Sequence, residues 1–192
     1  QHELEEAGIS IIPRWNFSSF DDAIEFIGKN PERYVLKPSG LAQNEKELLF
    51  VGQEEDGKDI LEMLQRYKKN WGKKIKEFQL QKFISGVEVA VGAFFNGAEF
   101  VGPINVNFEH KRMFPGELGP STGEMGTAML FMNDSPLFNA TLAKMKARLA
   151  ESGYVGYIDL NCIVNSRGVY PLEFTSRFGY PHISIMMEGV LS

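Results

Sequence analysis

Four oxygen-bearing side chains near the end of the chain could form a cation site. Asp159 and Asn161 alternate along one apolar segment, and Glu173 and Thr175 alternate along the next. Alternate residues of a strand point to the same face, so two paired antiparallel strands would bring these oxygens together. Such oxygens suit a hard cation, for example magnesium carried by a nucleotide. The alternative is that these carboxylates are solvated or salt-bridged at a strand end.

A lysine earlier in the chain is placed to meet an anion. Lys37 ends an apolar segment and is followed by Pro38-Ser39-Gly40, where backbone donors lie close by. An ammonium group beside such donors is typical of phosphate binding. A plain surface lysine fits the local sequence equally well.

The stretch from residue 109 to residue 126 is rich in glycine, proline and polar residues, and it includes Glu109-His110-Lys111-Arg112 and Ser121-Thr122-Gly123. Glycines let a backbone approach an anion, while hydroxyl, amide and cationic groups donate to it. Because residues 109–125 are too long for a plain connection, we expect a functional loop there. A flexible, solvated loop is the alternative.

The composition excludes several classes of protein. The 192 residues carry a net charge of -5 and a pI near 5.3, and no apolar run approaches the roughly 20 residues of a membrane span, so we expect neither a nucleic-acid nor a membrane partner. The single cysteine, Cys162, is expected to be a buried strand residue rather than a nucleophile, and it favours a reducing, cytoplasmic setting. Walker loops, Gly-x-Gly-x-x-Gly, His-Glu-x-x-His and Gly-x-Ser-x-Gly are absent.

Apolar periodicity predicts the elements that position these groups. Helices are expected up to residue 8, from residues 18–22 onward, across residues 60–67 and 138–149, and from residue 183. Strands are expected at residues 9–12, 34–37, 48–51, 78–84, 87–95, 100–106, 154–164 and 169–174. Asn96-Gly97 is a hairpin signal.

These elements predict an α+β fold of two subdomains, residues 1–78 and residues 79–192. The chain starts with Gln1 and with what reads as the last turns of a helix closed by Gly8, so we expect a fragment of a longer protein.

Four elements resemble, in order, the motifs of one family. Residues 34–42 (YVLKPSGLA) are similar to a VVKADGLA strand and loop, and residues 83–89 (FISGVEV) to an EEFLxGEE hinge. Residues 109–126 are similar to DHKR followed by DxGPNTGGMG, and residues 172–181 to LEFNxRFGDPE. From about residue 9 onward, the chain resembles the phosphoribosylamine-glycine ligases of purine synthesis, within the ATP-grasp superfamily.

The resemblance implies an ATP-grasp fold with ATP and Mg2+ (or Mn2+) held between two α+β subdomains, and activation of a carboxylate as an acyl phosphate that an amine attacks. The implied ATP-binding residues are Lys37 and Lys46 at the phosphates, Gln81, Lys82, Phe83 and Ile84 at adenine, and Glu88 at the ribose. The implied metal ligand is Glu173, with Thr175 in the place of a second ligand, and the strand pattern described above adds Asp159 and Asn161 to this set. Catalytic roles fall to Lys111, Arg112 and Arg177, and substrate binding to Ser121, Thr122 and Gly123. The implied partners are a small-molecule carboxylate, an amine and flanking domains of the same chain.

The chain departs from the family pattern near the phosphates. Residues 43–47 (QNEKE) replace the glycine-rich AAGKGV and keep only Lys46 as a cation. Thr175 replaces the metal-binding asparagine of EFN; its hydroxyl is a weaker magnesium ligand, for which Asp159 or Asn161 would compensate. An alternative function is therefore a divergent, non-catalytic ATP-grasp domain that binds nucleotide or scaffolds partners. A third alternative is an unrelated α/β domain whose loop imitates the motif.

Overall fold

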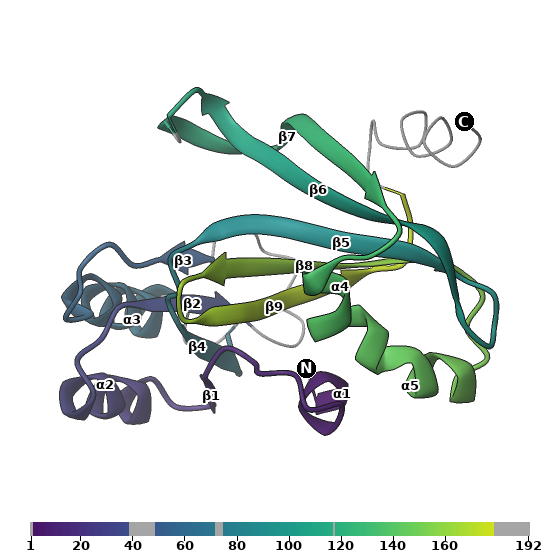
Figure 1. Ribbon diagram of the computed structural model, residues 1–192. Helices are drawn as coiled ribbons and strands as arrows, with labels where there is room; N and C mark the ends of the chain where they lie inside the picture. The colour runs from purple at the N-terminus through teal and green to yellow at the C-terminus, as the bar shows by residue number, and fades with distance from the viewer. Residues whose placement is uncertain (1, 39–48, 72–74, 117, 179–192) are drawn as a thin grey trace. The chain divides into compact units, whose positions relative to one another are not determined.

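The computed structural model describes residues 2–38, 49–71, 75–116 and 118–178 (Figure 1). The chain divides into two compact units, residues 12–84 and residues 1–11 with 85–192. Each unit is an antiparallel sheet with helices packed on one face, as expected of an α+β protein. Every helix in the described part of the chain is too short or too polar to cross a bilayer.

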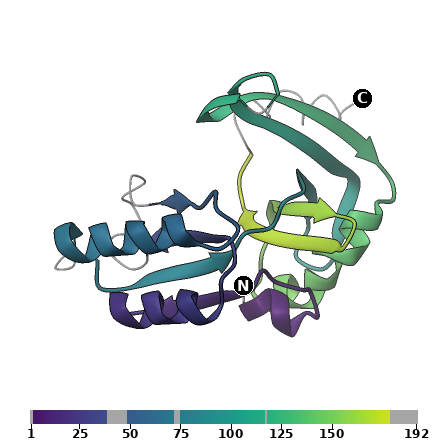
Figure 2. The ribbon, with the colours of Figure 1, turned by 90° about the vertical axis from the view of Figure 1, so that its left-hand side faces the viewer.

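Residues 12–84 form a four-stranded sheet in the order β1-β4-β2-β3 (Figure 2). Its strands are β1 (Arg14–Phe17), β2 (Tyr34–Pro38), β3 (Phe50–Val51) and β4 (Phe78–Lys82). The helices α2 (Phe20–Lys29) and α3 (Lys58–Trp71) cover one face and bury Ala23, Ile27, Ile60 and Leu64 against it. As predicted, α2 starts at a hydroxyl residue, because the Ser19 side chain accepts a hydrogen bond from Asp22 N.

The second unit is built on a five-stranded sheet in the order β7-β6-β5-β8-β9. Its strands are β5 (Val87–Phe95), β6 (Phe100–Phe114), β7 (Leu118–Met132), β8 (Gly156–Asn165) and β9 (Gly168–Thr175). Its helices are α1 (His2–Glu6), α4 (Pro136–Ala140), the 3-10 helix η3 (Leu142–Met145) and α5 (Lys146–Glu151). These helices contribute Leu4, Phe138, Leu142, Met145 and Leu149 to one apolar core beneath the sheet.

The sequence-based division at residues 78 and 79 differs from these units. β4 spans that point and pairs with both β1 and β2, so residues 79–84 stay with the first sheet. The helix α1 packs through Leu4 into the core of the other unit.

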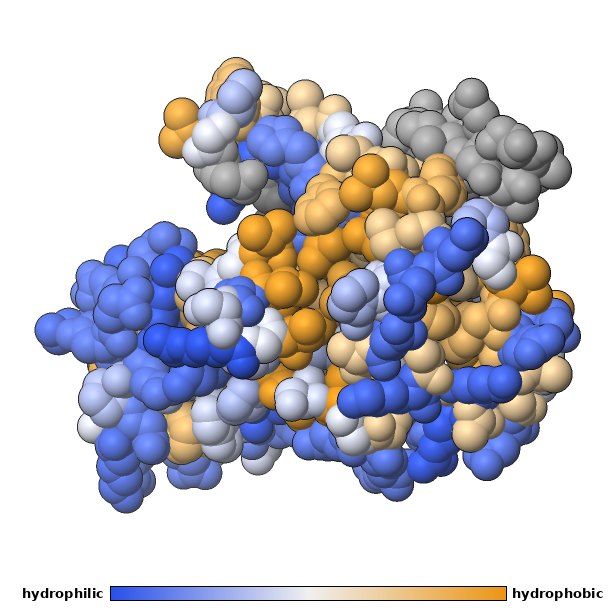
Figure 3. Space-filling view, viewed as in Figure 1, coloured by the Kyte–Doolittle hydropathy of each residue, from blue (hydrophilic) through white to orange (hydrophobic). Residues whose placement is uncertain are grey.

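The expected loop at residues 109–125 is wrong, because most of this segment belongs to the long antiparallel hairpin of β6 and β7. A strand that is buried on one face normally has alternating apolar and polar residues. The outer part of this hairpin is exposed on both faces, so its sequence lacks that alternation. Large apolar side chains are exposed along it, and apolar residues show among polar ones at its tip (Figure 3). They are Phe108, Met113, Phe114, Leu118, Met125 and Leu130.

Two other expected elements differ from the structure. Residues 9–12 form no strand, although Ile9 and Ile12 are buried: the apolar character of Ile9 reflects its packing into the core beneath the five-stranded sheet rather than strand pairing. The helix expected at residues 138–149 is three short pieces. It breaks at Thr141, whose hydroxyl donates to Leu137 O at 2.6 Å. The helix expected from residue 183 lies outside the described residues.

Candidate functional site

One face of the five-stranded sheet gathers most of the predicted site residues of this unit. Alternate residues of β5 and β8 enter the core, so the residues between them point to the opposite face. The register of β8 with β9 sets Asn161 opposite Glu173 and Asp159 opposite Thr175. The juxtaposition predicted for these four side chains is therefore present.

The four side chains offer the oxygen types that a hard cation accepts. Asn161 donates its Nδ2 to Glu88 Oε1 at 2.6 Å, which leaves the amide oxygen Oδ1 for a ligand. In the described part of the chain, no three His, Cys, Asp or Glu side chains form a group able to hold a metal. A cation here would therefore need the amide and hydroxyl oxygens as well as the two carboxylates. In chemical type the set fits Mg2+.

A charged cluster centred on Lys111 lies on the same face. The Lys111 ammonium is hydrogen-bonded to Glu88 Oε1 and lies 3.2 Å from Glu109 Oε2. Burial alone would lower the pKa of Lys111, but the hydrogen bond and charge of Glu88, with those of Glu109, outweigh it and raise the pKa above its ordinary value. Because Asn161 shares Glu88 Oε1, the cluster connects directly to the oxygen-rich group. Two predicted site residues, Glu88 and Lys111, are thus brought together.

The predicted substrate-binding residues lie on β7, across the hairpin from Lys111 and Arg112. Thr122 Oγ1 donates to Lys111 O at 2.7 Å, and Arg112 donates to Gly119 O at 3.0 Å. Ser121 pairs with Arg112 in the strand register, and Gly123 follows Thr122 on β7. The hairpin ladder therefore places these residues beside one another.

A buried polar network next to Asp159 was not predicted from the sequence. Tyr157 Oη lies 3.4 Å from both Asp159 Oδ2 and Asn105 Oδ1, and Asn107 Nδ2 donates to Asn105 Oδ1 at 3.0 Å. Asn105 Nδ2 and Asn107 Oδ1 are buried without a hydrogen-bond partner. A signal was available, because Asn105, Asn107 and Glu109 alternate with apolar residues, as Tyr157, Asp159 and Asn161 do.

Arg177 and Cys162 lie outside the charged cluster. Arg177 follows β9, is exposed, and donates to the backbone carbonyl of Phe178 at 3.2 Å. Cys162 is buried in the core, as predicted, and burial together with the charge of Asp159 raises the pKa of its thiol to about 12.

The remaining predicted ATP-binding residues all belong to residues 12–84, and Lys46 is the one among them that lies outside the described residues. Lys37 is opposite Gln79 in the register of β2 with β4, and alternation puts both on the face away from the helices. Gln81 shares that face; it is 3% exposed and its Nε2 has no hydrogen-bond partner.

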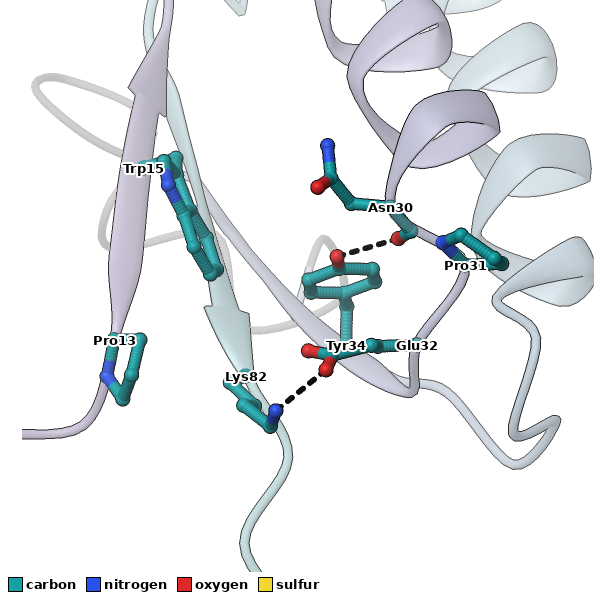
Figure 4. A pocket seen from close by; sticks show the side chains of 7 residues that line it. All are labelled: Pro13, Trp15, Asn30, Pro31, Glu32, Tyr34 and Lys82. Atoms are coloured by element: carbon teal, nitrogen blue, oxygen red, sulfur yellow. Dashed lines mark hydrogen bonds and ion pairs between the residues drawn. The ribbon is translucent and has the colours of Figure 1, made fainter.

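The hinge residues beyond Gln81 point elsewhere. Lys82 lines a pocket of about 420 Å³ on the helix-covered side, where its ammonium pairs with Glu32 Oε1 at 2.6 Å (Figure 4). A contact of Lys82 with adenine would therefore have to come from its backbone. The Phe83 ring lies under the Arg33 guanidinium, 3.6 Å from its carbon to the ring centroid, and Ile84 ends this unit.

Comparison with known proteins gives a consistent result. The sequence model described as phosphoribosylglycinamide synthetase, ATP-grasp (A) domain, matches residues 1–183. A phosphoribosylamine-glycine ligase of Streptococcus pneumoniae is 29% identical over 96% of this chain and 45% of its own length. One from Listeria monocytogenes is 25% identical over 98% of this chain and 46% of its own length. The chain thus spans less than half the length of these relatives.

Solved structures show the same fold. The phosphoribosylamine-glycine ligase of Thermotoga maritima superposes with a TM-score of 0.68 at 24% identity, over 94% of this chain and 47% of that one. The phosphoribosylglycinamide synthetase of Anaerococcus prevotii gives 0.62 at 13% identity, over 97% and 44%. The predicted α+β fold of ATP-grasp type is therefore confirmed.

Proposed function

Because this chain belongs to the phosphoribosylglycinamide synthetase family, as its ATP-grasp (A) domain, we propose that it is the ATP-binding part of an ATP-dependent carboxylate-amine ligase. The reaction is that of its relatives, phosphoribosylamine-glycine ligases of purine biosynthesis. Glycine would be activated as an acyl phosphate, and phosphoribosylamine would attack it with release of phosphate. The observation that carries the proposal is the pairing of Asp159 and Asn161 with Thr175 and Glu173, beside the Glu88–Lys111 pair.

We assign the nucleotide to residues whose chemistry suits each of its parts. Glu88 accepts hydrogen bonds from the ribose hydroxyls, residues 81–84 contact adenine, and Lys37 and Lys46 contact the phosphates. Asp159, Asn161, Glu173 and Thr175 hold Mg2+ (or Mn2+). When bound, that cation neutralises charge on the phosphoryl oxygens during transfer.

The cationic residues act on the transferred group. The raised pKa keeps Lys111 protonated at neutral pH, so it donates to phosphoryl or acyl-phosphate oxygens. Arg112 and Arg177 carry permanent charge for the same oxygens, and residues 121–123 of β7 bind the substrate carboxylate. These roles require a small-molecule carboxylate and an amine as partners.

The relatives are about twice as long as this chain, and we propose that further domains of the same protein complete the substrate sites. The setting is the cytoplasm, where ATP and the reduced Cys162 thiol are both maintained.

Calorimetric titration with ATP, with and without Mg2+, tests the nucleotide and metal assignments together. Wild type should bind ATP more tightly with Mg2+, and Glu173→Ala should lose that gain. Glu151→Ala removes an exposed carboxylate at the end of α5 and should behave as wild type. If Glu173→Ala keeps the magnesium gain, the metal assignment is wrong.

ADP release then separates the ligase from its alternative. The assay uses the full protein with its further domains, because these complete the substrate sites. Steady ADP production with glycine and phosphoribosylamine supports a ligase. Nucleotide binding by the full protein without ADP release supports the divergent, non-catalytic domain, which the loss of glycine from residues 43–47 favours. If wild type binds no ATP, the nucleotide assignment is wrong, and the remaining candidate function is a domain that scaffolds partners.

A further inference from the structure

An aromatic cluster is built over Gly92 on the polar face of the sheet. The Tyr157 ring stacks on Phe178 with centroids 4.9 Å apart and 27° between planes, and meets Phe94 edge-on at 5.5 Å. A β-carbon at residue 92 would lie only 2.2 Å from Tyr157 Oη, so the glycine makes the room in which the phenol sits. Three neighbours thus fix the position of one hydroxyl group.

The hydroxyl meets two acceptors, Asp159 Oδ2 and Asn105 Oδ1, at 3.4 Å each. A phenol hydroxyl has one proton to donate, so it can donate fully to only one of these two acceptors. Asn105 Oδ1 already accepts from Asn107 Nδ2 at 3.0 Å. A charged acceptor forms the stronger hydrogen bond, which favours Asp159 as the partner.

The network beneath the phenol is closed to solvent. Asn105 is 0% exposed and Asn107 1%, while Asp159 is 9% exposed at the edge of the oxygen-rich group. A hydrogen bond from the buried Tyr157 hydroxyl restricts the rotamers of the Asp159 carboxylate. Hydrogen bonds from residues outside the metal's own ligands orient those ligands in this way.

We propose that Tyr157 is a positioning residue that orients the Asp159 carboxylate toward a divalent cation, an inference that rests on the proposed function, in which Asp159 is a metal ligand. Tyr157 does not touch the cation or the nucleotide in this role. It acts through Asp159, and its own position depends on Gly92, Phe94 and Phe178.

Binding of Mn2+ in the presence of saturating ATP, followed by electron paramagnetic resonance, tests the proposal without relying on turnover. Tyr157→Phe keeps the ring and removes only the hydroxyl. We expect about 10- to 100-fold weaker Mn2+ binding, the usual effect of losing such an outer partner. Tyr170→Phe, on β9 outside the cluster, should bind Mn2+ as wild type does.

Two further variants make the outcome decisive. Asp159→Asn should weaken Mn2+ binding at least as much as Tyr157→Phe. Phe178→Leu keeps the hydroxyl but removes the stacked ring, so a smaller loss is expected, and this half-buried residue can be replaced even if Tyr157→Phe does not fold.

The inference and the proposed function fail in different ways. If Asp159→Asn loses Mn2+ affinity but both aromatic variants bind as wild type, the positioning role is overturned and the metal assignment stands. If Asp159→Asn itself binds Mn2+ as wild type does, the metal assignment is wrong and the positioning role falls with it.

Discussion

Replacement of Gly92 by alanine puts one methyl group into a closely packed point of the polar face. The new β-carbon would lie 2.2 Å from Tyr157 Oη, 2.7 Å from Tyr157 Cζ and 2.7 Å from Asp159 Cβ. All three atoms belong to β8, so the strand or the tyrosine ring must shift. Overpacking of this kind costs about 1–3 kcal/mol. A gain of up to about 1 kcal/mol from the stiffer unfolded chain offsets part of it. We expect a net loss of about 1–2 kcal/mol.

A second substitution tests whether this loss has the stated cause. Tyr157→Phe removes Oη, the closest of the three contacts, but leaves Cζ and Asp159 Cβ in place. The free-energy cost of Gly92→Ala should therefore fall, but not vanish, in a Tyr157→Phe background. A coupling energy of about 0.5–1 kcal/mol between the two substitutions is expected for residues in direct contact.

Urea unfolding with two probes measures the effect. Both tryptophans, Trp15 and Trp71, belong to residues 12–84, so their fluorescence follows that unit. Far-UV circular dichroism reports the strands of both units. Gly92→Ala should move the dichroism transition to lower urea and move the tryptophan transition less. Equal stability of Gly92→Ala and wild type, or the same cost in both backgrounds, would refute the steric reasoning.

Three further predictions follow from charges, a thiol and a helix cap. The raised pKa of Lys111 contributes stability that is present below its ordinary pKa and lost as the pH rises through the folded-state pKa, so Glu88→Gln, which lowers the folded-state pKa, should make this alkaline loss smaller and complete it at lower pH. It should also cost about 1 kcal/mol at neutral pH by thermal melting, a value between those of surface and buried pairs. With its pKa raised to about 12, Cys162 should resist a disulfide reagent at pH 8 until urea is added. Ser135→Ala removes the side chain that caps α4 at Phe138 N and should lose about 1 kcal/mol in the same melts.

Each of these predictions has a control variant or an outcome that would contradict it. Glu151→Gln should leave the alkaline profile unchanged, and a Glu88→Gln profile identical to wild type contradicts the assigned pairing. Rapid labelling of Cys162 without urea contradicts its burial. Ser18→Ala, at an exposed serine beside the N-cap of α2, should be neutral, and an equal loss there would show that capping is not what Ser135 contributes.

Elements whose sequence pattern comes from one-sided burial could be predicted. Residues 87–95 were expected as a strand and form β5 with the same bounds, because alternate residues from Val89 to Phe95 enter the core. The hairpin of β8 and β9 was also expected, and with it the meeting of Asn161 with Glu173. In both cases a period of two carries the information.

Features without a one-sided apolar pattern, and pairings between distant segments, could not be predicted. The outer part of the β6–β7 hairpin is held by backbone hydrogen bonds between its two strands, and both of its faces are exposed. Its sequence therefore shows no alternation of apolar and polar residues. Alternation marks the polar positions of the Tyr157 network, but not their pairing across 52 positions, from Asn105 to Tyr157. The network also depends on a glycine whose only signal is an absent side chain. The roles assigned to the site residues, including Arg177 and residues 121–123, remain predictions.

Strands β5 and β8 present an apolar face to the core and a polar face on the opposite side, and this division bears on how the sequence of such a protein can change during evolution. One set of positions, such as Val91 and Leu160, serves packing, while the intervening set, such as Glu88 and Asn161, forms the polar face on which we propose the active site. Because the two sets point to opposite faces of the sheet, substitutions in the second set can alter the proposed site while leaving the apolar layer intact. A lineage can therefore acquire new reactions on this sheet without first acquiring a new fold, except at Gly92, where packing and chemistry meet in one residue.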